Sequence, residues 1–154
     1  MKPSLLQQMS QRTLNLSTLI ENNKDEGAEA VMSGLIVFER RLAQALEQVG
    51  KQMQSGEGPA SISAAITSCL PHAARYGAED LSAIAHNAIA SLDKLDVADE
   101  PLQGEAITHV MAWHAMAGQT RAVVKLAFQM AILYGLAPNG AVLEFEDAQD
   151  PFDA

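Results

Sequence analysis

The sequence is poor in cysteine, aromatic residues and positive charge. Cys69 is the single cysteine among 154 residues, so the chain cannot form an internal disulfide, and a reducing compartment is the simpler interpretation. Aromatic residues make up 5% of the chain, so the core must be built mainly from aliphatic side chains. Ten Lys and Arg stand against 19 Asp and Glu, a net charge of −9. This balance argues against direct binding to nucleic acid or to an anionic membrane.

A long hydrophobic run is also missing. The chain begins Met1-Lys2-Pro3 and has no apolar stretch of the kind found in secretory signal peptides. Its most apolar segment, 122–137, contains Lys125 and Gln129 and is shorter than the roughly 20 residues that a membrane-spanning helix needs. We therefore expect a cytoplasmic protein without a membrane-spanning segment.

Motifs of common catalytic sites are absent from the sequence. Gly56 and Gly58 are not followed by the Lys-Ser or Lys-Thr of a phosphate-binding loop. The chain has no Gly-x-Ser-x-Gly pattern of the kind that positions a nucleophilic serine. These absences favour a non-enzymatic protein with no catalytic residues and no cofactor.

The four histidines offer little for metal binding. Glu105 and His109 are four residues apart and share one face of a helix, but no second Glu-x-x-His pair completes a metal site. We therefore expect no metal ligands.

His86 suggests a different chemistry. It is expected beside the apolar seam of a helix, and in outline it resembles the exposed phosphoacceptor of histidine phosphotransfer domains. The residues after it, Asn87-Ala88-Ile89, depart from the Leu-Lys-Gly type of segment usual in those domains. The resemblance implies a histidine phosphotransfer-type signalling module as an alternative function, with His86 as phosphoacceptor.

Apolar residues recur with the period of helices along most of the chain. The pattern predicts an all-α fold of five to six antiparallel helices, arranged as a helical bundle or as a short helical-hairpin array. Pro71 is expected to end or kink the third helix, and Gly118 to Thr120 to separate the last two. The expected helices cover 4–22, 26–53, 59–76, 79–95, 102–117 and 121–134.

The chain divides into two parts by composition. Residues 1–137 are expected to form a single helical domain with a linker near 54–59, where Ser, Gly and Pro cluster. Residues 138–154 form an acidic C-terminal tail with five Asp and Glu and no Lys or Arg.

The most regular helical pattern lies between Val31 and Met53. Apolar or small residues recur there at steps of three and four, which predicts that the helix over 26–53, about 40 Å long, is amphipathic and needs a helical partner along its length. Leu35, Phe38 and Leu42 are the central residues of this seam. The seam is covered by other helices of the chain or by another chain, and the second case predicts a homodimer or a partner helix.

Candidate contact residues also occur elsewhere. Trp113 is the single tryptophan, a residue type enriched at interface hot spots, and it is expected to be a core residue or a partner anchor. Leu143, Phe145 and Phe152 interrupt the acidic tail, and a segment of this kind can dock in a basic, apolar groove.

These features together predict a non-enzymatic protein-binding module, a small acidic chaperone or adaptor that covers the amphipathic segment of a partner protein. Its seven Met suit adaptable apolar contacts, and its negative charge selects basic partners. A further alternative is a regulator that binds a transcription factor without binding DNA itself.

Overall fold

The computed structural model describes residues 12–15, 18, 21, 27–56 and 58–133. Within them the chain is all-helical. Its helices are α3 (Ala28–Ser55), α4 (Pro59–Thr67), α5 (Leu70–Arg75), α6 (Glu79–Val97) and α7 (Glu105–Leu133). No helix in this part of the chain is long and apolar enough to span a membrane.

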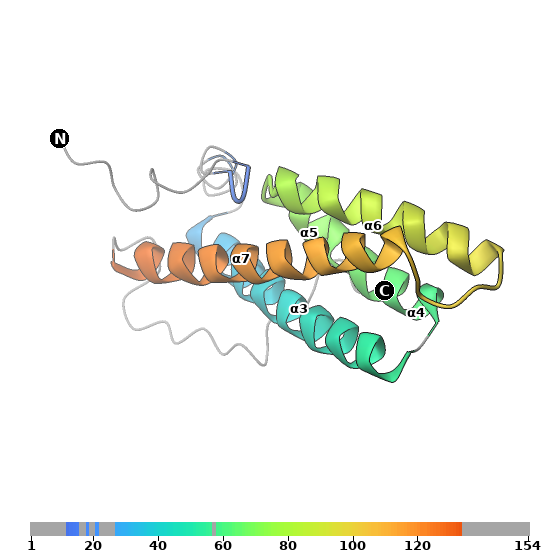
Figure 1. Ribbon diagram of the computed structural model, residues 1–154. Helices are drawn as coiled ribbons and strands as arrows, with labels where there is room; N and C mark the ends of the chain where they lie inside the picture. The colour runs from blue at the N-terminus through green and yellow to red at the C-terminus, as the bar shows by residue number, and fades with distance from the viewer. Residues whose placement is uncertain (1–11, 16–17, 19–20, 22–26, 57, 134–154) are drawn as a thin grey trace.

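The helices form a bundle in which the first and last long helices meet. α3 packs on α4, both α4 and α5 pack on α6, and α6 packs on α7, which also packs on α3. Figure 1 shows the chain reversing direction at each connection, with the short α5 extending α4. Short connections favour antiparallel neighbours, and this closed ring of contacts is a four-helix bundle rather than an open hairpin array.

Local sequence signals set the ends of these helices. Gly56 ends α3 with φ 70°, a left-handed conformation that glycine adopts without steric cost, and its N–H donates to the Gln52 carbonyl. Pro59 occupies the first turn of α4, where its missing N–H costs nothing. Glu79 and Asp80 lie in the first turn of α6, where negative charge interacts favourably with the helix dipole.

The core is aliphatic, as the composition predicts, with one aromatic cluster at its centre. The Phe38 ring of α3 stacks on the rings of His72 and Tyr76, with centroids 5.6 Å away in both cases. All three residues are buried. The Tyr76 hydroxyl accepts a hydrogen bond from Arg75 Nε at 3.2 Å, and it lies directly against the backbone of Gly34. This cluster fixes α3 against α5.

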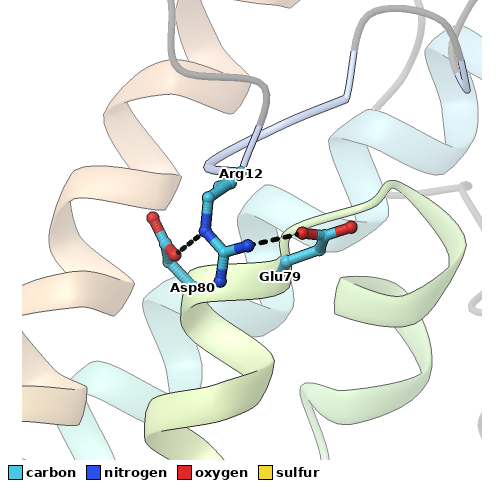
Figure 2. Close-up of polar contacts among 3 residues, drawn as sticks. All are labelled: Arg12, Glu79 and Asp80. Carbon is cyan, nitrogen blue, oxygen red and sulfur yellow. Dashed lines mark hydrogen bonds and ion pairs between the residues drawn. The ribbon is translucent and has the colours of Figure 1, made fainter.

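A segment far from α6 in sequence is fixed to its beginning. Arg12 Nε donates to Asp80 Oδ1 at 2.7 Å and Arg12 Nη1 to Glu79 Oε2 at 3.0 Å, as Figure 2 shows. The hydrogen bond to Asp80, with the charges of Asp80 and Glu79, raises the pKa of Arg12. The Asn15 N–H donates to the Tyr76 carbonyl and the Asp80 N–H to the Arg12 carbonyl.

The helix expected over 4–22 is therefore wrong at residues 12–15, which form a turn and a bend. Contacts with distant parts of the chain explain this conformation. The backbone there hydrogen-bonds to the α5–α6 connection, and the Leu14 side chain is buried in the core. Asn15 Oδ1 accepts the N–H of Thr18, and Thr18 and Glu21 are helical. The rest of this predicted helix lies outside the described residues.

The predicted break at Gly118 is also wrong, because α7 runs without interruption from Glu105 to Leu133. Thr120 is buried inside the helix, and its hydroxyl donates to the Met116 carbonyl one turn earlier instead of capping a new helix. Gly118 weakens a helix but does not end it when its neighbours are packed. The expected fifth and sixth helices are therefore one element, and in the described part of the chain the bundle is built by α3, α6, α7 and the shorter α4 with α5.

Because Gly118 lies in an uninterrupted helix, Gly118→Ala is expected to stabilise the protein. A Cβ built at this position meets no atom within 4 Å, so the gain is the helix propensity of Ala over Gly, about 0.5–1 kcal/mol. Urea unfolding followed by circular dichroism would measure it. A loss of stability would contradict a continuous α7.

Candidate functional site

The site is built on α7, which has a buried apolar face and an exposed face without charged residues. One faces the core, with buried residues at alternating steps of four and three. These residues are Ala106, Val110, Trp113, Ala117, Thr120, Val124 and Ala127. Their spacing is that of one helix packing along its length against neighbours, here α3 and α6.

The opposite face of α7 is exposed and carries no charge over about four turns. We call it the outward face, defined by Thr108, Met111, Ala115, Gly118 and Ala122, all exposed. Met111 is 59% exposed, and Ile107 at its edge is 37% exposed. These residues are again three or four positions apart, so they line one side of the helix.

The missing charge on this face is a property of the sequence. Between Glu105 and Arg121, α7 contains no Asp, Glu, Lys or Arg. A helix face that meets only water normally carries charged and polar residues, whereas a helix that is apolar on all sides is usually covered on all sides. The outward face therefore lacks the charge of an ordinary solvated helix face, and its polar neighbours are His114 and Gln119.

Acidic residues cluster in the chain just before and at the start of α7. Asp96, Asp99, Glu100 and Glu105 are all exposed at the end of α6, in the α6–α7 connection and at the start of α7. Lys94 is the basic residue in the last turn of α6. The start of α7 is therefore acidic.

A groove of about 500 Å³ lies at the other end of α7, between its second half and the first half of α3. We call it the α3–α7 groove. Its apolar lining comes from Leu35, Ile36, Val124 and Phe128, and its polar lining from Glu39, Arg121, Lys125 and Gln129.

One carboxylate in this groove holds two cations. Arg121 Nε lies 2.6 Å and Lys125 Nζ 3.6 Å from Glu39 Oε1. The side chains of Arg121 and Lys125 are 37% and 53% exposed, against 18% for Glu39. The groove therefore has an excess of one positive charge, with its cations nearer to water than its carboxylate, in a chain whose net charge is −9.

The structure places the predicted contact residues of α3 and α7 inside the molecule. Leu35 is 2% exposed, and Phe38, Leu42 and Trp113 are fully buried. The seam of α3 is thus covered by the chain's own helices. Trp113 Nε1 has no hydrogen-bond partner among the described residues, so its role there is packing. Leu143, Phe145 and Phe152, and with them the acidic tail 138–154, lie outside the described residues.

The histidines are distributed over separate places. His86 is exposed on α6, while His72 is buried against Phe38. His109 Nδ1 lies 2.5 Å from the Ser91 hydroxyl and connects α7 to α6. In the described part of the chain, no group of three or more His, Cys, Asp or Glu side chains could hold a metal ion.

Sequence reasoning missed both surfaces of α7. The charge-free stretch between Glu105 and Arg121 is visible in the sequence, and it could have indicated the outward face had α7 been predicted as one helix. The α3–α7 groove has no such signal, because Glu39 and Arg121 are 82 residues apart.

Comparisons with known proteins found no match to this chain among protein-family models, curated proteins or solved structures.

Proposed function

We propose that the protein is a non-enzymatic protein-binding module that packs the outward face of α7 against an amphipathic helix of a partner protein. The observation that carries the proposal is the exposure of a charge-free helix face from Ile107 to Ala122. Helix-in-groove and helix-on-helix recognition use apolar residues at this spacing. A small acidic chaperone or adaptor is a protein of this kind.

Charge around the face suggests which partner helix fits. The acidic residues at the start of α7 favour basic residues at one end of the partner helix, and charge complementarity of this kind raises association rates and specificity. Small side chains at Ala115, Gly118 and Ala122 permit close approach of the partner backbone. The expected partner segment is therefore a helix with an apolar or small-residue stripe and one basic end.

Substitution at the centre of the face tests the proposal. Ala115→Glu places a carboxylate where the partner helix would pack, and Ala83→Glu places the same group on the exposed side of α6 as a matched control. Proteins captured from native lysate by the parent chain would be identified, purified and titrated against all three chains by calorimetry.

We expect Ala115→Glu to weaken binding by about tenfold or more, because burying an unpaired charge costs more than the 1.4 kcal/mol that corresponds to tenfold. Ala83→Glu should bind like the parent. A partner that binds both variants equally well would refute the assignment to α7. If light scattering instead shows a dimer that Ala115→Glu converts to a monomer, the helix on the outward face is a second copy of this chain.

A further inference from the structure

The outward face of α7 has the properties of a surface that pairs with a second copy of itself. The proposed function calls for a partner helix with an apolar or small-residue stripe and one basic end. α7 itself fits that description, because its charge-free stretch is followed by Arg121 and Lys125. Lys125 is 53% exposed, and the two cations share a single carboxylate, that of Glu39.

Charge sets the direction in which two such helices pair. α7 carries three charged residues, Glu105 at its start and Arg121 and Lys125 in its second half. Glu105 and Lys125 lie ten residues to either side of Ala115, the middle residue of the outward face. Parallel pairing would bring two acidic starts together, whereas antiparallel pairing around a two-fold axis at Ala115 places each acidic start level with the basic half of the other helix.

Side-chain size fits the same arrangement. Met111, which is 59% exposed, is the largest residue of the outward face, and Gly118 is the smallest. The two are seven residues apart, about two turns, so they lie along one line of the helix. A two-fold axis at Ala115 keeps this line on one side of the contact and brings Met111 of each copy within about 1.5 Å of the level of Gly118 in the other. A Cβ at Gly118 meets no atom within 4 Å, so the space over this glycine is open to the methionine.

We propose that the chain forms an antiparallel homodimer through the outward face of α7, with Ala115 at the two-fold axis and Met111 of each copy over Gly118 of the other. The contact extends over about four turns of one helix, which is short for an obligate interface, so the dimer exchanges with the monomer. The second copy and a partner helix therefore compete for one surface. This inference rests on the proposed function in one respect, the use of the outward face for helix packing.

Cysteine cross-linking tests the orientation and the register. The native Cys69 is buried, so it does not compete with an introduced thiol. Under mild oxidation Ala115→Cys is expected to form a disulfide-linked dimer about tenfold faster than Ala83→Cys, a matched control on the exposed side of α6, because its two thiols meet at the axis. Thr108→Cys and Ala122→Cys should each cross-link at the control rate alone, with their thiols about 21 Å apart along the axis, and rapidly when the two chains are mixed.

Sedimentation velocity on the unmodified chain measures the dimer directly, and the dimer fraction should rise with protein concentration. Gly118→Leu fills the space over the glycine in both copies, so it should raise the dissociation constant by about tenfold or more. Ala83→Leu adds the same side chain away from the contact and should leave the dissociation constant unchanged.

Two results would overturn the proposal. A chain that sediments as a monomer at every concentration forms no such dimer, and rapid cross-linking of Thr108→Cys alone would mean that the helices pair in parallel. A partner helix that binds a strictly monomeric chain leaves the proposed function standing while this inference fails. A dimer with the expected cross-links that binds no partner helix supports this inference and removes the foreign partner from the proposed function.

Discussion

Phe38→Ala is expected to lower the free energy of unfolding by about 3–5 kcal/mol. The side chain is fully buried, and it stacks on both His72 and Tyr76. Its removal leaves a cavity between α3 and α5 and breaks two aromatic contacts. Each contact contributes about 0.5–1.5 kcal/mol to stability beyond the burial of apolar surface. Urea unfolding followed by the fluorescence of Trp113, the single tryptophan, would measure the change.

A loss of this size is a large part of the 5–15 kcal/mol that stabilises a typical domain, so a milder variant is needed beside it. Phe38→Leu keeps the site apolar and loses only the ring contacts, and it should cost about 1.5 kcal/mol. A cost below about 1 kcal/mol for Phe38→Ala would mean that Phe38 is not at the centre of the core.

Gly34→Ala is expected to destabilise the protein by about 1–3 kcal/mol, although alanine is the better helix former. A Cβ at this position would lie 1.9 Å from the Tyr76 hydroxyl oxygen. Tyr76 cannot move aside easily, because its ring is buried and stacked on Phe38. The clash therefore separates α3 from the end of α5, and the same unfolding experiment reports it.

Two further variants isolate the cause. Gly50→Ala, in the same helix, brings its Cβ to an ordinary 3.9 Å from His114 Nε2, so it should stabilise the protein by about 0.5–1 kcal/mol. Tyr76→Phe removes the clashing oxygen, so it should cost less in the Gly34→Ala background than in the parent chain. A double-mutant cycle that shows strict additivity would rule out this contact as the cause.

Helical periodicity predicted the parts of the fold that depend on one amphipathic face. The seam through Leu35, Phe38 and Leu42 predicted α3 and its burial against helices, and the expected bounds of α3 and α6 differ from the observed ones by two residues at most. Pro71 was expected to end or kink the third helix, and the chain there is divided into α4 and α5. Each of these signals is local, so the sequence is enough to find it.

Features that depend on tertiary contacts could not be predicted in this way. Thr120 has the chemistry of a helix cap, and its burial within α7 is decided by packing on other helices. Residues 12–15 leave the helical conformation because Tyr76 and Asp80 supply partners for their backbone. The α3–α7 groove and its ion pair between Glu39 and Arg121 form only once α3 packs on α7, which no periodicity reveals.

The contact between α3 and α7 has a consequence for how the chain folds during synthesis. The N-terminal long helix packs on the last one, so part of its apolar face has no cover until residues beyond Val124 have left the ribosome. Contacts of such long sequence separation slow folding, and surface exposed in the meantime is open to aggregation and to capture by chaperones. Nascent chains stalled before α7 should therefore be protease-sensitive in α3, and chains stalled after it should be resistant.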